Sequence, residues 1–169
     1  MSMAQCWSTC QTIPTVRLIS RRRYDLAVKW RLFRHFITGA DPDSIRVYQW
    51  HIEARKSTNA KVNVGMDSNK RDLGIYVRAA ADLCESMTRI GFVPSYAIPI
   101  DPDIELLGGA HRTACALALG IDDVPVVSMP QRVWAPPWDL QWFIDNGMND
   151  SDLERLKSDF EGMYDRGHG

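Results

Sequence analysis

The sequence predicts an α/β (α+β) fold, a small mixed sheet flanked by helices, and three observations support this prediction. Residues 24–38 and 72–90 place apolar side chains at the three- and four-residue spacing of amphipathic helices, and a glycine, Gly39 or Gly91, follows each stretch. Shorter alternating or apolar runs lie between and after these stretches, as expected of strands. A chain of 169 residues, 45% of them hydrophobic, is long enough to bury one core.

Five shorter runs have the alternation or the apolar composition of strands. They are residues 15–20, 45–53, 98–100, 104–107 and 124–127. The polar stretch 55–67 is expected to be a loop, and residues 113–119, rich in helix formers and followed by Gly120, a further helix. Residues 1–14 are expected to form a flexible N-terminus, so the domain that contains the sheet is expected to span 15–130.

The last part of the chain, 131–169, is expected to form a linker rich in Pro and Trp and then two helices packed on the same domain. The helices are expected near 140–145 and from about residue 152. Ser151 and Glu154 have the spacing of a capping box, S-x-x-E, for the second helix. The tryptophans of the linker are expected to pack these helices onto the domain.

Charge and cysteine content narrow the functional classes. The net charge of −1 argues against a global field that attracts DNA or anionic membranes. No apolar run approaches the roughly 20 residues of a membrane span, so no membrane partner is expected. The four cysteines contain no CxxC pair, which favours reduced thiols and a cytoplasmic location.

Basic residues are nevertheless concentrated in one stretch, 17–34. Arg17, Arg21, Arg22, Arg23, Lys29, Arg31 and Arg34 stand there against a single acid, Asp25. A solvated helix face is one interpretation of such a run, and a patch that binds phosphate or a partner is the other.

The segment 104–127, IELLGGAHRTACALALGIDDVPVV, is expected to be a strand, a glycine turn, a helix and a second strand. Gly108 and Gly109 allow positive φ and a close approach of the backbone to a ligand. His111 and Arg112 then fall in the first helical turn, where N–H groups and the macrodipole favour an anion. The turn therefore predicts an anion site. An ordinary strand–turn–helix with an exposed Arg is the alternative.

Two further sets of residues could take part in chemistry. If 45–53 is a strand that continues to Arg55, then His51, Glu53 and Arg55 share one face and form a candidate set for acid–base catalysis and anion binding. A solvated strand face is the alternative. Glu105, beside the glycine turn, could hold Mg²⁺ next to a triphosphate, or it could point to solvent.

The order strand, G-G-x-H-R, Ala-rich helix, Gly and V-P-V strand resembles the signature of the ParB/sulfiredoxin superfamily. The stretch before it matches as well, because 72–91 (DLGIYVRAAADLCESMTRIG) ends in the pattern S-M-x-x-x-G and a run with Ile and Pro follows at 97–100. The resemblance covers 68–127. It implies a ParB/sulfiredoxin-like fold, to which this chain adds an N-terminal helix and a C-terminal helical appendage.

In this superfamily the turn binds nucleotide phosphate, in partition ParB proteins, sulfiredoxins and free serine kinases. Carried over by position, the resemblance implies a phosphate site formed by Gly108, Gly109, Ala110, His111, Arg112 and Thr113. Lys70 or Arg71 would assist, although both could also belong to an ordinary polar helix start. Ala110 stands where sulfiredoxins have the nucleophilic Cys, so sulfiredoxin activity is not expected. No helix-turn-helix pattern follows residue 127, so partition activity is not expected either.

The resemblance therefore favours a nucleotide-dependent phosphotransferase (kinase) or NTP hydrolase that acts on a small molecule, with ATP or another NTP and Mg²⁺ as cofactors. His111 and Arg112 would bind the β- and γ-phosphates, His51 or Glu53 would be the base, and His111 could also move a proton. A non-catalytic nucleotide- or nucleic-acid-binding module, with 17–34 as its contact surface, is the alternative. A ParB-like nuclease comes last, because no carboxylate cluster could hold two metals.

Overall fold

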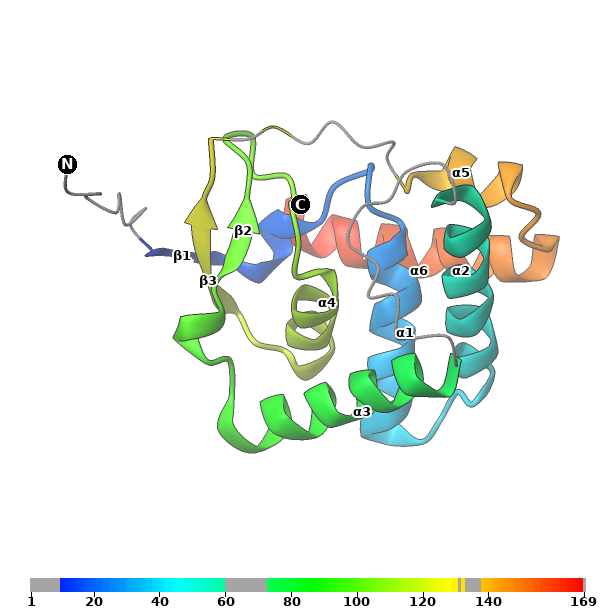
Figure 1. Cartoon of the computed structure of the whole chain (residues 1–169), viewed down its shortest axis with the longest axis horizontal. Helices are drawn as coiled ribbons and strands as arrows, with labels where there is room; N and C mark the ends of the chain where they lie inside the picture. The colour runs from blue at the N-terminus through cyan, green and yellow to red at the C-terminus, as the bar shows by residue number, and fades with distance from the viewer. Residues whose placement is uncertain (1–9, 60–72, 131, 133–137, 169) are drawn as a thin grey trace.

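The computed structural model describes residues 10–59, 73–130, 132 and 138–168, and it confirms a small mixed sheet flanked by helices (Figure 1). The strands are β1 (Cys10–Pro14), β2 (Ile98–Ile100) and β3 (Asp123–Ser128). Their order is β1-β3-β2, and β3 pairs antiparallel with β1 and parallel with β2. The helical crossover from β2 to β3 is the segment that carries the predicted anion site.

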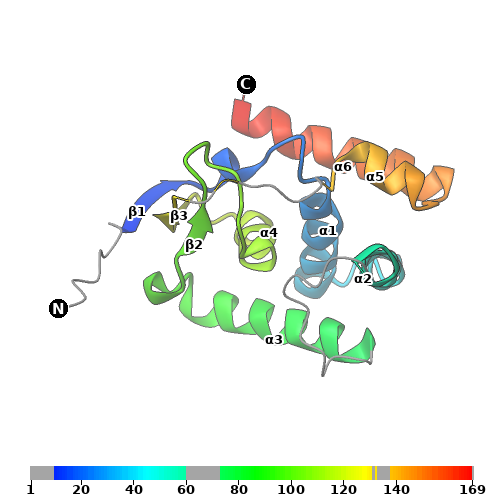
Figure 2. The ribbon, with the colours of Figure 1, turned by 45° about the horizontal axis from the view of Figure 1, so that its top comes forward.

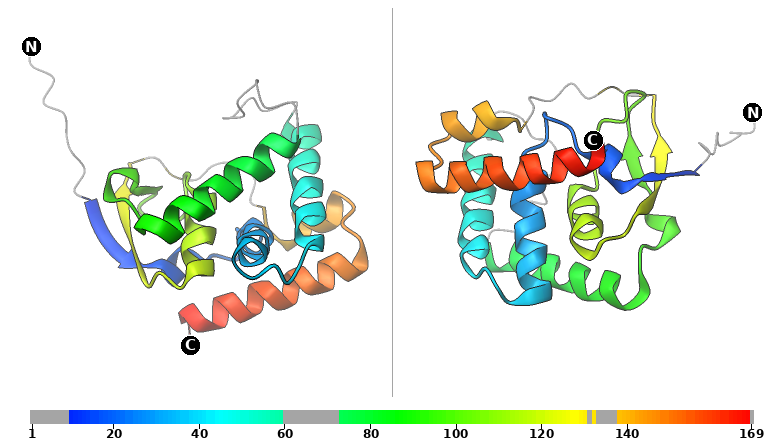
Figure 3. Two further views of the ribbon diagram at one scale, coloured as in Figure 1. Left: turned by 90° about the horizontal axis from the view of Figure 1, so that it is seen from below. Right: turned by 180° about the vertical axis from the view of Figure 1, so that it is seen from behind.

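The helices of the described residues lie beside the sheet. They are α1 (Asp25–Thr38), α2 (Asp43–Asn59), α3 (Leu73–Ile90), α4 (Ala110–Leu119), α5 (Leu140–Asp145) and α6 (Asp150–His168), with 3-10 turns η1 (Thr15–Leu18) and η2 (Pro94–Tyr96). Figure 2 shows the sheet, α4, α1 and α2 in a row, with α3 on one side and α6 on the other. Seen from behind, α6 crosses α1 and reaches η1 (Figure 3). Helix α1 is therefore the centre of the molecule.

The core lies where α1 passes between its neighbours. Leu26, Leu32 and Phe33 of α1 are completely buried. Helix α4 faces α1 with small side chains, including the fully buried Ala114 and Cys115, which lets the two helices approach closely. Helix α4 therefore lies between the sheet and α1, with Gly109 before its first residue and Gly120 after its last.

Several predicted elements are confirmed. The helices 24–38 and 72–90 are present as α1 and α3, and each ends at a glycine in the left-handed region, with φ of 69° at Gly39 and 72° at Gly91. The strand 98–100, the strand around V-P-V and the helix 140–145 are also present as β2, β3 and α5.

The prediction of a strand at 15–20 is wrong, because the strand is β1 and the chain turns into η1 directly after it. Residues 10–14 of the predicted flexible N-terminus are thus part of the sheet. Leu18 and Ile19 are both buried although they are adjacent, which breaks the apparent alternation. Thr15 fixes the turn, since its hydroxyl donates to the Ile121 carbonyl at 2.6 Å and its N–H to the Asp122 carbonyl at 2.7 Å.

The prediction of a strand at 45–53 is also wrong, because these residues belong to α2. The buried side chains Val47, Tyr48, His51 and Ile52 recur at helical spacing. Pro42 directly before the helix and Asp43 in its first turn are signals for the start of a helix. The strand prediction gave more weight to the β-forming residues of the run. The loop predicted at 55–67 is helical up to Asn59, and its remainder lies outside the described residues.

The strand predicted at 104–107 is a turn instead. Only Leu106 pairs with the sheet, in a single bridge to Ile100. The Asp101 carboxylate accepts the N–H groups of Asp103 and Glu105 at 2.8 and 2.9 Å, and Ile104 has a φ of 66°. The chain therefore leaves β2 through an Asx-type turn before it reaches the glycines.

The capping box predicted for the last helix is displaced by two residues. Asn149 caps α6: its Oδ1 accepts the N–H of Asp152 at 2.9 Å, and its Nδ2 donates to the Asp152 carboxylate at 2.6 Å. Ser151 lies inside the first turn, so it cannot act as the cap.

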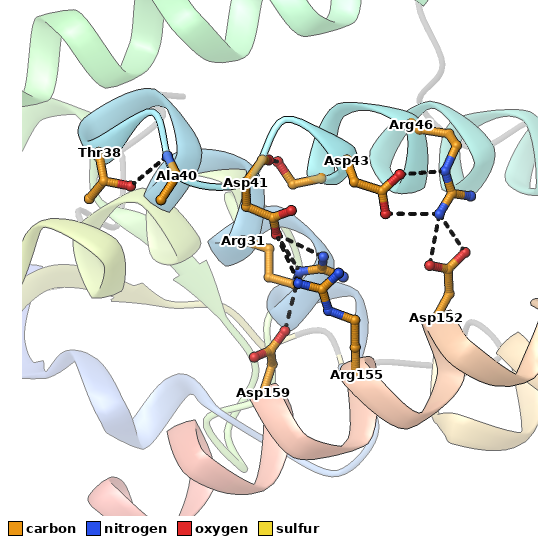
Figure 4. A network of polar contacts seen from close by, with 10 residues as sticks. Arg31, Thr38, Ala40, Asp41, Asp43, Arg46, Asp152, Arg155 and Asp159 are labelled. Carbon is orange, nitrogen blue, oxygen red and sulfur yellow. Dashed lines mark hydrogen bonds and ion pairs between the residues drawn. The ribbon is translucent and has the colours of Figure 1, made fainter.

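Ion pairs join α6 to the body of the molecule (Figure 4). Buried Arg31 of α1 contacts Asp41 at 2.7 Å and Asp159 of α6 at 3.3 Å. Arg46 of α2 contacts Asp152 of α6 at 2.8 Å. The Phe160 ring also stacks on Tyr24 with centroids 3.8 Å apart, so α6 packs on the core through both charge and apolar contacts. Within the described residues, no helix is long and apolar enough to cross a membrane.

Candidate anion-binding site

The first turn of α4 is the place where the sequence predicts an anion site. Gly109 is its N-cap, with a φ of 75°, and no side chain of the described residues caps the helix. The first helical hydrogen bond runs from the Thr113 N–H to the Gly109 carbonyl at 2.9 Å. The N–H groups of Ala110, His111 and Arg112 precede that bond and belong to the positive end of the macrodipole.

Both glycines of the turn are closely packed. A Cβ on Gly108 would lie 3.4 Å from the Pro99 ring. A Cβ on Gly109 would lie 3.1 Å from the Arg112 guanidinium and 3.4 Å from Ile98, in addition to the strain of a positive φ. Gly109 therefore has the positive φ that the sequence predicts, whereas Gly108 does not and is only closely packed.

The Arg112 guanidinium folds back over Gly109. Its Nη1 donates to the Tyr96 carbonyl and, at 3.4 Å, to the Ala97 carbonyl. The side chain thereby ties the start of α4 to the segment before β2. Its role as a phosphate ligand stays a prediction.

His111 points instead to α2. Its Nε2 lies 2.8 Å from the hydroxyl of Tyr48, and the two rings meet edge to face at 5.8 Å. Tyr48 is only 1% exposed, so this contact is shielded from solvent. Tyr48 could not be predicted as a site residue from a strand at 45–53. Only a helix places Tyr48, His51 and Arg55 on one stripe, at three- and four-residue spacing.

The helical geometry separates the predicted catalytic residues. His51 and Arg55 lie one turn apart on the buried side of α2, whereas Glu53 is exposed elsewhere on the helix. The prediction that all three share a face is therefore wrong. Glu53 is two residues from His51, and side chains at this spacing point to different sides of a helix.

His51 is completely buried between α2 and α5. Its ring packs against Trp142 at 5.6 Å and Phe143 at 5.5 Å, and neither ring nitrogen has a partner among the described residues. Burial holds the pKa of His51 well below its usual value, and the cations Lys29 and Arg55 act in the same direction. The imidazole is therefore neutral at physiological pH.

A buried carboxylate, Asp25, lies at the start of α1. Arg23 contacts it at 2.8 Å and Lys29 at 2.5 Å. Burial alone would raise the pKa of Asp25, but these two cations hold it well below the usual range. Arg23 also donates to the Leu106 carbonyl at 3.2 Å, which joins this cluster to the turn that leads into α4.

Arg55 adds a third cation to this cluster. Its guanidinium stacks on the Trp138 ring at 4.5 Å, and the same ring lies 5.1 Å from Arg23. Within the described residues no acid forms an ion pair with Arg55, and its buried Nε has no hydrogen-bond partner. Burial lowers the pKa of Arg55, which expresses the cost of holding this charge away from water.

Among the described residues, the cluster therefore holds more positive than negative charge. Arg23, Lys29 and Arg55 carry three positive charges, against Asp25 and the more peripheral Glu105, whose field reaches Arg23. Burial lowers the pKa of Lys29 to about 8 in spite of Asp25, because Arg55 and Arg23 also repel its ammonium group. An anion beside the cluster would balance the surplus.

Other predicted ligands are not brought to this site. The Glu105 carboxylate accepts from the Ser20 hydroxyl at 2.9 Å, and no group of three or more His, Cys, Asp or Glu in the described part of the chain could hold a metal ion. Lys70 and Arg71 lie outside the described residues.

The basic run 17–34 is largely used inside the protein. Arg21 pairs with Glu161, Arg31 with Asp41 and Asp159, and Arg23 and Lys29 with Asp25. Arg17, Arg22 and Arg34 are exposed. The run is therefore mainly a source of structural ion pairs, and it provides little continuous surface for nucleic acid.

No protein-family model, curated protein or solved structure matches the chain. The resemblance to the ParB/sulfiredoxin superfamily thus stays a prediction, and the chemistry of the site rests on the residues described above.

Proposed function

We propose that this protein binds the phosphate groups of a nucleotide at the start of α4, as the resemblance to the ParB/sulfiredoxin superfamily implies. One observation carries the proposal: Arg55 is a largely buried cation with no carboxylate partner among the described residues, on the same helical stripe as the Tyr48 that contacts His111. Figure 1 shows that α1 begins and α2 ends at the same end of the molecule. Asp25 and Arg23 are accordingly close enough to Arg55 to act on its charge.

The binding free energy is sufficient for a nucleotide phosphate only if the first turn of α4, Arg55 and His111 act together. A helix N-terminus contributes about 0.3–1 kcal/mol, or about 2 when partly buried. Millimolar affinity requires about 4 kcal/mol. A hydrogen bond from a charged donor adds about 1.5–3 kcal/mol. The first turn of α4, Arg55 and His111 together therefore reach useful affinity, whereas the turn alone does not.

Phosphoryl transfer to a small molecule, or hydrolysis of an NTP, is the activity we propose for this site. Such reactions depend mainly on positioning and charge neutralisation, which a cationic cluster beside a helix N-terminus supplies. His111 is the proposed acid–base group, because His51 is fully buried and Glu53 is exposed away from the stripe. ATP or another NTP with Mg²⁺ would be the cofactor.

Calorimetric titration of the full chain with ATP, CTP and pyrophosphate tests the proposal. Arg55→Met keeps most of the side-chain volume and is expected to weaken binding by about 10- to 100-fold, since a charged hydrogen bond of roughly 1.5–3 kcal/mol is lost. Its melting temperature without ligand should stay equal or rise, because an uncompensated buried charge is removed. A structural arginine would instead lower the melting temperature.

Arg78→Met is the matched control, because Arg78 is exposed on α3. It should bind as the unmodified chain does. The proposal fails if Arg55→Met binds with unchanged affinity, or if the unmodified chain binds none of the three ligands at millimolar concentration.

A further inference from the structure

We infer that Trp138 holds the guanidinium of Arg55 in a fixed orientation, in which its N–H groups can bind two oxygens of one oxyanion. Trp138 is then a positioning residue, and the ligand class is an oxyanion with two oxygens on one centre, such as a phosphate group. The part of this inference that concerns the ligand rests on the proposed function. The orientation of Arg55 can be measured without any ligand.

The Trp138 ring lies close to two guanidinium groups that are bonded very differently. Cζ of Arg23 lies 5.1 Å from the ring centroid, and Cζ of Arg55 lies 4.5 Å from it. Arg23 donates to both carboxylate oxygens of Asp25, at 2.8 and 3.0 Å, and to the Leu106 carbonyl at 3.2 Å. Arg55 donates to no described residue, although its Nε is buried. Of the two cations at this ring, Arg55 is therefore the one with donors left for a ligand.

The backbone on both sides of Trp138 is fixed. The Trp138 carbonyl accepts the N–H of Tyr24 at 2.9 Å, at the start of α1. Asp139, the next residue, caps α5, because its carboxylate accepts the Trp142 N–H at 3.0 Å. Neither contact involves the Trp138 side chain, so a substitution at this position leaves both in place.

A tryptophan ring orients a guanidinium without using its donors. The face of the ring attracts the cation through the ring quadrupole, but it provides no oxygen that accepts the N–H groups. These N–H groups lie in the plane of the guanidinium as a rigid fork, which matches two oxygens of one phosphate or carboxylate group. Because the orientation exists before the ligand arrives, less side-chain entropy is lost on binding.

Arg55 also lies near the turn at which the phosphate is proposed to bind. Its charge acts on Tyr48, and the Tyr48 hydroxyl lies 2.8 Å from Nε2 of His111 in the first turn of α4. Tyr48 therefore connects Arg55 to that turn. The fork of Arg55 and the N–H groups of the turn can thus serve the same ligand.

The first experiment is a ¹H–¹⁵N spectrum of the arginine side chains in the full chain, without ligand. Arg55→Lys removes the Arg55 Nε–H signal and so identifies it. The expected signal is displaced upfield by the ring current of Trp138, and Trp138→Leu should return it to the ordinary range. Trp30→Leu is the matched control, because Arg34 and Arg166 lie over the Trp30 ring, and it should leave the Arg55 signal unchanged.

Pyrophosphate titration of the same variants is the second readout. Trp138→Leu should bind about 3- to 10-fold more weakly, whereas Trp138→Phe keeps an aromatic face and should recover most of the affinity. Arg55→Lys keeps the charge but loses the planar fork, so it should bind about 10-fold more weakly. Trp30→Leu should bind as the unmodified chain does.

The inference is overturned if the Arg55 signal of the unmodified chain shows no ring-current displacement, or if a folded Trp138→Leu variant binds pyrophosphate with unchanged affinity. Unchanged affinity in Arg55→Lys, or equal losses in Trp138→Phe and Trp138→Leu, would overturn it as well. If Trp138→Leu does not fold, the spectrum of the unmodified chain and the affinity of Arg55→Lys still decide. An upfield Arg55 signal in a chain that binds no pyrophosphate refutes the proposed function alone.

Discussion

Replacement of Asp25 by Asn is expected to lower the free energy of unfolding by about 3–5 kcal/mol, because it leaves buried cations without their counter-ion. Arg23 and Lys29 both contact this carboxylate, and all three side chains are at most 9% exposed. Asn conserves the volume, so the loss reports charge and not packing. Urea unfolding followed by circular dichroism measures the change.

Two variants make this result specific to the buried cluster. Asp82→Asn alters an exposed carboxylate of α3 and should change stability by no more than about 0.5 kcal/mol. The double variant Asp25→Asn/Lys29→Met removes one cation together with the carboxylate, and it should be more stable than Asp25→Asn alone. A double variant that is less stable than the single one would contradict the charge imbalance.

The second large effect is expected from Phe160→Ala in α6. Phe160 is fully buried and stacks on Tyr24 at 3.8 Å, so its truncation leaves a cavity next to α1. The expected cost is about 3–5 kcal/mol. For a chain of this size, the melting temperature should fall by about 2–4 °C per kcal/mol. The whole chain should unfold in a single transition, because α6 shares the core.

Ile144→Ala is the control for this prediction, because Ile144 of α5 is 44% exposed. It should change stability little. An early, separate transition in Phe160→Ala, with the main transition unchanged, would show that α6 folds independently of the rest.

The elements that were predicted correctly are those with sequence signals close to their own ends. The apolar spacing and glycine stops of α1 and α3, and the glycine turn before α4, are all readable within about 20 residues. Helix α2 was missed because β-branched and aromatic residues dominate its first half, and packing against α1 and α3 overrides that preference. The helical spacing of Tyr48 and His51, together with the start signals Pro42 and Asp43, could have predicted it.

Only the local part of the candidate site could be predicted from the sequence, because its other contacts join residues that are far apart along the chain. His111 and its helix N-terminus come from one local motif, whereas Tyr48 is 63 residues away from it along the chain. The pairing of Asp25 and Lys29 has the i,i+4 spacing of a helix, but the sequence does not show that both are buried. The direction of Arg112, toward carbonyls of the segment before β2, depends on tertiary contacts as well.

The most direct test of the anion site is a ¹H–¹⁵N spectrum of the assigned chain during titration with pyrophosphate at constant ionic strength. The backbone amides of Ala110, His111 and Arg112 should show the largest shifts, together with the Nε–H of Arg55, because these donors face the proposed anion. Shifts confined to the exposed residues Arg17, Arg22 and Arg34, or no shifts at millimolar pyrophosphate, would contradict the proposed site.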